Sequence, residues 1–118
     1  MCDIGNVEYQ DVFPMDRAQL ERLLESGNEK AMVDALLSAA CYDADWRWVQ
    51  STCLRLLDHP AKWVRWNAAT GLGYLARIHK KLDTEIVVPK LLALRADAEI
   101  ASNVEDALDD IKWYLRPQ

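Results

Sequence analysis

Residues that form turns and cross-links are scarce in this chain of 118 residues, which has four prolines, four glycines and three cysteines. So few Pro and Gly residues argue against a loop-rich or all-β design, because these two residues mark most turns. Cys2, Cys41 and Cys53 are odd in number and irregularly spaced. This pattern favours reduced thiols over a disulfide framework. We therefore expect a cytoplasmic protein.

Long apolar segments are missing as well. No run of 18 or more apolar residues occurs, so we expect neither a membrane span nor a membrane partner. The first ten residues lack both the basic part and the apolar part of a signal peptide. Both absences agree with the cytoplasmic location that the cysteines indicate.

The chain also has little of what metal binding or catalysis requires. His59 and His79 are its only histidines, and no cysteine lies at ligand spacing from either. The single Gly-x-Gly pattern lies inside a helical pattern rather than after a strand, unlike a phosphate-binding loop. Cys41 and Cys53 fall on apolar helix faces, where thiols behave as small core residues. We therefore expect no enzyme activity, no catalytic residue, no cofactor and no metal.

Apolar residues at helical spacing dominate what is present. They make up 51% of the chain, enough for one domain with a core. Asp16 followed by Gln19 forms a capping-box signature, and Asn28, Asp45 and Asp83 stand where the N-caps of later helices belong. Residues 1–14 show no helical pattern and predict an irregular N-terminal arm. The predicted helices are 16–26, 28–41, 46–57, 58–78, 84–96 and 100–115.

The helix predicted over residues 58–78 is apolar nearly all round, so we expect it to be the central helix, covered on several sides. Asp58 or His59 would be its N-cap, with Pro60 at the first helical position. Gly71 and Gly73 each cost about 1 kcal/mol relative to alanine inside a helix, which predicts the close approach of a neighbouring helix. Its tryptophans, Trp63 and Trp66, are predicted to pack in the body of the protein. In the fifth helix, Pro89 predicts either a start near Val88 or a kink.

The segment Val64-Arg65-x-x-Ala68-Ala69-x-Gly71-Leu72-Gly73 resembles the HEAT repeat in its short bacterial form, with Gly71 in place of the usual alanine. Spacings of 39 and 40 residues recur, as between Val49 and Val88 and between Val64 and Val104, which suits a two-helix unit. The resemblance implies an all-α fold, a short HEAT-like α-solenoid of about six helices. Residues 1–118 would form a single HEAT-like domain.

Charge is distributed unevenly along the chain. Residues 1–46 carry ten acids and three bases, residues 47–95 three acids and nine bases, and residues 96–118 six acids and two bases. The basic middle segment also contains three of the five tryptophans, Trp48, Trp63 and Trp66, and Trp46 directly precedes it. It leaves open a nucleic-acid-binding function, although such surfaces usually belong to proteins that are basic overall. The net charge of −5 makes nucleic acid an unlikely partner.

The last predicted helix is the most unusual surface. Its acids are disfavoured by like-charge neighbours at i,i+4 and, toward its C-terminal half, by the helix dipole. A feature that costs stability twice is a candidate for function, and tryptophan is frequent among binding hot spots. We expect the acids to fall on faces opposite the buried positions Ile100, Val104, Leu108 and Ile111. The candidate partner-binding residues are Glu99, Glu105, Asp106, Asp109, Asp110 and Trp113.

Small bacterial HEAT-type proteins, which this chain resembles over about residues 28–115, include immunity proteins of contact-dependent growth-inhibition toxins. The resemblance implies a protein that binds a cognate toxin, a basic nuclease in many cases, and neutralises it by covering it with an acidic face. A generic HEAT adaptor remains the other alternative to nucleic-acid binding.

Overall fold

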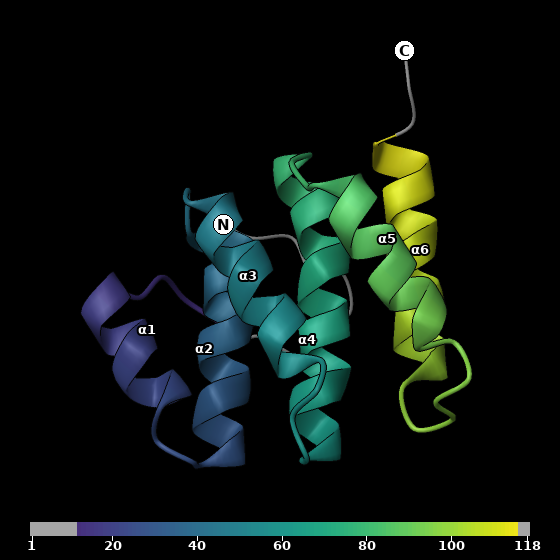
Figure 1. Ribbon diagram of the computed structural model, residues 1–118. Helices are drawn as coiled ribbons and strands as arrows, with labels where there is room; N and C mark the ends of the chain where they lie inside the picture. Colours follow the sequence, from purple (N-terminus) through teal and green to yellow (C-terminus); the bar gives the residue numbers. More distant parts are fainter. Residues whose placement is uncertain (1–11, 116–118) are drawn as a thin grey trace.

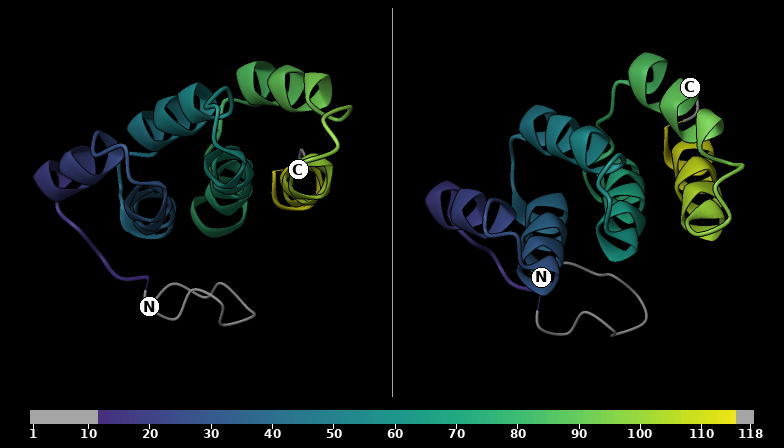
Figure 2. Two further views of the ribbon diagram at one scale, coloured as in Figure 1. Left: turned by 90° about the horizontal axis from the view of Figure 1, so that it is seen from below. Right: turned by 60° about the horizontal axis from the view of Figure 1, so that its bottom comes forward.

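A computed structural model describes residues 12–115, and within them the chain is all-α, with six α-helices and no strand. The helices form two rows, with α1, α3 and α5 in one and α2, α4 and α6 in the other (Figures 1 and 2). A π-helical turn, η1, continues α4. The bounds are α1 Arg17–Leu24, α2 Glu29–Tyr42, α3 Trp46–Leu56, α4 Lys62–Tyr74, η1 Leu75–His79, α5 Thr84–Ala93 and α6 Ala101–Tyr114.

Three of the predicted N-caps are confirmed. Asp16 Oδ1 accepts the backbone N–H of Gln19 at 2.8 Å, and Asn28 Oδ1 accepts that of Ala31 at 3.0 Å. Asp45 Oδ1 accepts the N–H of Trp48 at 3.2 Å. These bonds satisfy backbone donors that have no partner within the first turn of a helix. They fix the starts of α1, α2 and α3 at the predicted positions.

The prediction for the start of the central helix is wrong, because α4 begins at Lys62 and its N-cap is Ala61. Asp58 instead accepts a hydrogen bond from Lys90 Nζ at 2.9 Å. His59 Nδ1 accepts the backbone N–H of Ala61 at 2.9 Å, which stabilises the turn that contains Pro60. Neither side chain therefore caps a helix: Asp58 links to α5, and His59 stabilises the turn before α4.

Asp83 occupies the N-cap position of α5, as predicted, but its carboxylate makes no capping bond. Its Oδ2 accepts a hydrogen bond from Gln50 Nε2 at 3.0 Å, and its backbone N–H donates to Gln50 Oε1 at 2.7 Å. A start of the fifth helix near Val88 is wrong as well, since α5 already begins at Thr84 and Pro89 lies inside it. The buried amide of Gln50 ties α3 to the start of α5.

The central position of α4 is confirmed. It packs against α2, α3 and α6, and Val64, Ala68, Leu72 and Leu75 are fully buried. The α-helix itself ends at Tyr74, and η1 continues it to His79. The chain then turns at Lys80, whose φ is +55°. His79 lies against α2, with Nε2 2.8 Å from the carbonyl oxygen of Ala40.

Both glycines of α4 have a packing role. A Cβ at Gly71 would lie 2.9 Å from Sγ of the buried Cys53, and a Cβ at Gly73 would lie 3.2 Å from Cα of Ala107 in α6. Glycine therefore allows α3 and α6 to approach α4 closely. The predicted close approach of a neighbouring helix is confirmed at Gly73, where the contact is with backbone.

The structure also bears on the N-terminal arm, on Leu108 and on membrane spans. The predicted arm 1–14 falls mostly outside the described residues, and positions 12–14 form neither helix nor strand. Leu108, predicted as buried, is only half-buried. None of the helices in this part of the chain has the length and apolar character that crossing a membrane requires.

Candidate partner-binding surface

The solvent-facing side of α6 carries Asp106, Asp109 and Trp113. All three side chains are exposed, and Trp113 is 62% exposed. Spacings of three, four and seven residues place them on one face of the helix. Val104, Ala107 and Ile111 on the opposite side are buried. We call this face, defined by Asp106, Asp109 and Trp113, the acidic α6 face.

Two further candidates are acids whose charge is already paired. Glu99, in the turn before α6, accepts a hydrogen bond from the guanidinium of Arg65. Glu105 accepts one from Arg95 Nε at 2.6 Å. Within residues 12–115 neither Asp106 nor Asp109 has a hydrogen-bond or ion-pair partner. The acidic sequence of the last helix therefore divides into paired acids at its start and unpaired acids farther along.

Asp110 does not lie opposite the buried side, so the predicted position is wrong for this residue. It is half-buried between α6 and α4, and its Oδ2 would lie 2.9 Å from a Cβ at Gly73. Burial raises the pKa of the Asp110 carboxyl above its ordinary value, although the Arg77 charge lowers it. The carboxylates of Asp106 and Asp109 raise that pKa further. Asp110 therefore belongs to the α4–α6 contact and to the border of the acidic α6 face.

A hollow of about 630 Å³ adjoins the end of this face. It is lined by Asp109, Asp110, Lys112, Trp113 and Tyr114. Tyr114 also lies under a cation, since Lys80 Nζ is 4.9 Å from its ring centroid. The arrangement places carboxylates beside aromatic rings, a combination that suits the binding of cationic side chains.

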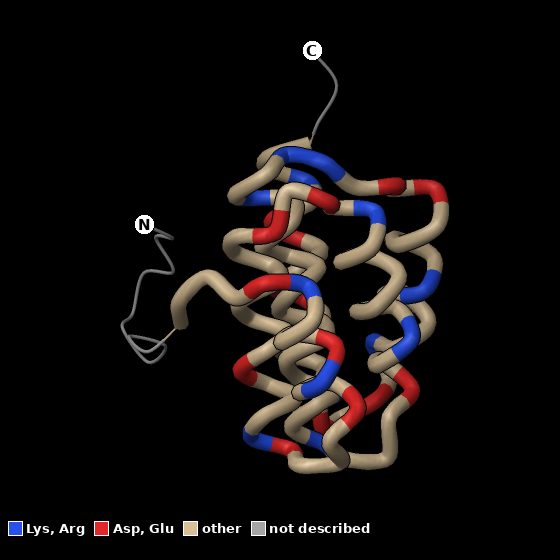
Figure 3. Tube along the Cα trace, turned by 90° about the vertical axis from the view of Figure 1, so that its left-hand side faces the viewer, with Lys and Arg blue, Asp and Glu red and all other residues tan. Residues whose placement is uncertain are grey.

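The basic middle segment does not form one uncompensated surface. Arg65 pairs with Glu99, Arg95 with Glu105, and Lys90 with Asp58. Seen from the α1 side, Lys and Arg residues are interspersed with Asp and Glu (Figure 3). Nucleic-acid binding depends on several cations acting together on phosphates. The observed pairing therefore weighs against the nucleic-acid alternative.

The prediction that Trp63 packs in the body of the protein is wrong. Its side chain is 53% exposed, whereas Trp66 is half-buried. The two indole rings lie 5.3 Å apart between centroids at an angle of 50°. Because α4 is apolar nearly all round, its pattern could not indicate which side the neighbouring helices leave open. Trp63 is thus a surface residue that sequence reasoning missed.

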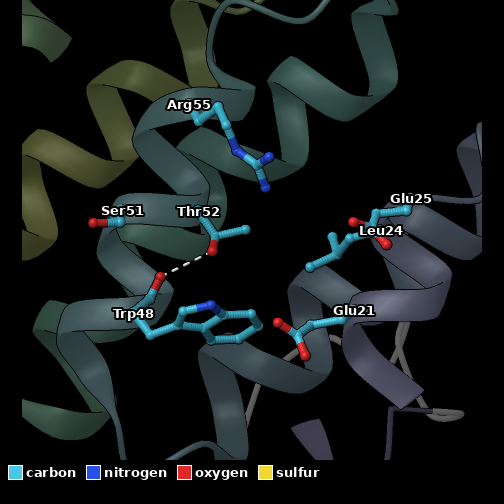
Figure 4. Close-up of a pocket in the computed structure, with 7 residues that line it drawn as sticks. All are labelled: Glu21, Leu24, Glu25, Trp48, Ser51, Thr52 and Arg55. Carbon is cyan, nitrogen blue, oxygen red and sulfur yellow. Dashed lines mark hydrogen bonds between the residues drawn. The ribbon is translucent and has the colours of Figure 1, made fainter. Parts of the chain in front are cut away.

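A second hollow of about 360 Å³ lies between α1 and α3 (Figure 4). Its lining residues are Glu21, Leu24, Glu25, Trp48, Ser51, Thr52 and Arg55. Thr52 Oγ1 donates to the carbonyl of Trp48 at 2.9 Å. The guanidinium of Arg17 covers the Trp48 ring at 3.8 Å and pairs with Asp43 and Asp45. Glu21, Glu25 and Arg55 add charged groups of both signs to the lining of the hollow (Figure 4).

The thiols of Cys41 and Cys53 are part of the hydrophobic core. Cys41 and Cys53 are both buried, and burial raises the pKa of the Cys53 thiol to about 12. A thiol with that pKa stays protonated at neutral pH and is a poor nucleophile. In the part of the chain that the structure describes, no three His, Cys, Asp or Glu side chains gather as metal ligands would.

Comparison with known proteins finds a similar chain among the solved structures. No protein-family model and no curated protein matches the chain. Among solved structures, it is similar to a chain in the crystal structure of a CDI complex from Cupriavidus taiwanensis LMG 19424, with 36% identity and a TM-score of 0.81. The similarity covers 90% of this chain and 96% of the other. The protein therefore belongs to the same family as that component of the CDI complex.

Proposed function

We propose that the chain is the immunity protein of a contact-dependent growth-inhibition system and that it binds and neutralises a cognate toxin. The observation that carries this proposal is the similarity to a chain of a CDI complex over nearly the full length of that chain. Similarity of this extent at 36% identity supports a shared binding role as well as a shared fold.

Three observations favour the immunity component over the toxin component. The buried Cys53 thiol is a poor nucleophile, the histidines at positions 59 and 79 are engaged with backbone groups, and several acids are paired with arginine or lysine. A toxin enzyme needs a cleft with convergent reactive groups. We therefore assign the chain a non-enzymatic, cytoplasmic role, in which neither a cofactor nor a metal takes part.

The architecture supports a surface for protein binding. We infer that residues 12–115 form one short HEAT-like solenoid, because alternate helices lie in two rows and each row continues along the molecule (Figure 2). Folds of this kind present extended surfaces made by successive helices. The last helix of one row is α6, so the side of α6 that faces away from α5 remains open to a partner.

Electrostatic attraction would bring a basic toxin to the acidic α6 face and would fix its orientation. Asp106 and Asp109 would make direct ion pairs, since no residue among 12–115 already pairs with them. Glu99 and Glu105 would join if partner cations displaced Arg65 and Arg95. Asp110 and Trp113 would flank the contact, and coverage of the toxin surface would block its activity.

The first test asks which component the chain is. Expression of the chain alone should leave bacterial growth unchanged, and coexpression with the toxin domain encoded by the adjacent gene should restore growth that this domain inhibits. Growth arrest by the chain alone would instead identify it as a toxin and would overturn the proposal.

The second test addresses the surface. Asp106→Lys with Asp109→Lys should raise the Kd for the adjacent gene product by about 100-fold or more, because like charges at an interface cost several kcal/mol. Glu21→Lys with Glu25→Lys is the matched control, since both residues are exposed acids that change the net charge equally but lie on α1. Equal effects of the two pairs would exclude the acidic α6 face as the specific contact.

A further inference from the structure

The start of α4 exposes Trp63 beside Trp66, which is partly buried against the core. Trp63 is 53% exposed, and its ring contacts Trp66 with centroids 5.3 Å apart. The buried contacts of the first turns of α4 are made by Val64 and Ala68, which are fully buried. An indole that is largely in water contributes little to the core, and a contiguous apolar surface of this kind often marks a binding site.

The aromatic pair lies on the same side of the molecule as the acidic α6 face. Trp63, Trp66 and Thr70 follow one another at spacings of three and four residues along α4. The hydroxyl of Thr70 accepts a hydrogen bond from Asn103 Nδ2 at 2.7 Å. Asn103 precedes Asp106 by three residues on α6. The tryptophans and the carboxylates are therefore linked through Thr70 and the buried Asn103, where α4 and α6 meet.

The relative direction of α4 and α6 determines where the tryptophans lie with respect to the carboxylates. Arg65 near the start of α4 reaches Glu99 just before α6, and Gly73 near the end of α4 lies against Asp110. The helices thus run parallel, with the tryptophan pair at one end and Trp113 at the other. Both belong to the row made by α2, α4 and α6 (Figure 2). Aromatic rings therefore stand at both ends of the exposed carboxylates Asp106 and Asp109.

The chemistry of this surface suits a cationic protein. The face of an indole ring attracts Lys and Arg cations more strongly than the other aromatic side chains do. Lys62 Nζ already lies 5.0 Å from the centroid of the Trp63 ring, which shows that a cation can reach it. This lysine is exposed, and an exposed contact of this kind exchanges readily with a partner's cation. Tryptophan is also enriched among residues that dominate binding energy.

We infer that Trp63 and Trp66 form the aromatic anchor of the partner interface, on which Arg or Lys side chains of the toxin stack while neighbouring cations pair with Asp106 and Asp109. The inference rests on the proposed function, because that function supplies a basic partner. It adds a second element, α4, to a contact surface that would otherwise consist of α6 alone.

The experiment measures the Kd of the full chain for the toxin domain encoded by the adjacent gene. Trp63→Ala should raise the Kd by about tenfold or more, as truncation of an aromatic hot spot does. Ile86→Ala is the matched control, because Ile86 is 56% exposed but lies on α5 in the other row. Its expected change is less than about twofold, in line with the small effects of most surface truncations.

Two further variants separate ring chemistry from apolar area. Trp63→Phe keeps an aromatic face and should bind more tightly than Trp63→Leu, which keeps apolar area without a ring. Equal Kd values for these two variants would overturn the stacking of cations. Circular dichroism of Trp66→Ala checks that the half-buried ring can be removed without unfolding before its Kd is compared.

The outcomes distinguish the two proposals. Tight binding by the wild type together with unchanged binding by Trp63→Ala would overturn the aromatic anchor and leave the proposed function standing. Absence of binding by the wild type would overturn both.

Discussion

The helices α4 and α6 belong to the same row but differ in how much of their surface neighbouring helices cover. Neighbours cover α4 on three sides, and its buried residues include two glycines that admit adjacent elements closely. The other helix, α6, packs against α4, α5 and η1 and leaves charged residues in water along its remaining side. In α4 the size of the side chains is therefore constrained by packing, whereas the open side of α6 is marked by its charged residues.

This difference predicts which substitutions affect the stability of the fold and which affect binding to a partner. A change of volume on the covered sides of α4 has no room to be accommodated, because protein interiors are close-packed. A change on the open side of α6 removes no buried contact, so its effect on folding should be small. Substitutions that violate either expectation would break the comparison.

Leu72→Ala should have the largest effect on stability. Leu72 is fully buried in α4, and the loss of a buried leucine side chain costs about 2–5 kcal/mol, including the cavity left behind. Chemical denaturation measures the loss. The control is Leu92→Ala on α5, where the side chain is 46% exposed. Similar losses for both would contradict the enclosed position of α4.

Gly73→Leu should come next. The new side chain would start 3.2 Å from Cα of Ala107 and 2.9 Å from Asp110 Oδ2. Such overpacking costs about 1–3 kcal/mol, because α6 must move away from α4. Ser102→Leu adds a comparable side chain on the exposed side of α6 and should change the free energy of unfolding by less than about 0.5 kcal/mol. A neutral Gly73→Leu, seen in the same denaturation experiment, would mean that the two helices are not in close contact.

Asn103→Ala should cost less, about 1 kcal/mol, because it removes the hydrogen bond to the Thr70 hydroxyl. A double-mutant cycle with Thr70→Val isolates this bond from the other contacts of both residues. The coupling free energy should be of the same size as the loss in the single variant. Additive effects of the two substitutions would show that the bond contributes nothing to stability.

Asp110→Asn should have the smallest effect, and its sign depends on pH. The folded state raises the pKa of Asp110, so it binds more protons than the unfolded state just above the ordinary pKa. Stability contributed by this group is therefore lost as the pH rises through that window. At neutral pH the asparagine variant should be slightly more stable than the wild type.

The advantage of Asp110→Asn should vanish at a pH below the ordinary pKa of aspartate, where the carboxyl is protonated in both states. Thermal unfolding across this pH range measures the difference. Glu21→Gln serves as the control, because Glu21 is an exposed acid on α1, away from Asp110. A stability difference for Asp110→Asn that does not vary with pH would contradict the burial of this carboxyl.

Local chemistry explains which parts of the fold could be predicted from the sequence. The caps at Asp16, Asn28 and Asp45 act over three residues, so their side chains and partners are visible together in the sequence. Asp83 and Asp58 looked equally suitable but are bound to Gln50 and Lys90, more than thirty residues away in each case. Tertiary partners of this kind leave no mark on a local pattern.

The same limit applies to the candidate surface. The sequence shows that acids accumulate in the last helix, but the pairing of Glu99 with Arg65 and the burial of Asp110 depend on the contact with α4. It shows that α4 is apolar nearly all round, but not which side lacks a neighbour. The pattern therefore predicts a packed Trp63, although its side chain is 53% exposed.

The most direct test of the central claim is a crystal structure of this chain with the toxin domain encoded by the adjacent gene. We predict that the toxin covers the open side of α6, with basic side chains at Asp106 and Asp109 and with Trp63 inside the contact. A complex in which the toxin lies on α1 and α3 and leaves α6 in water would contradict it.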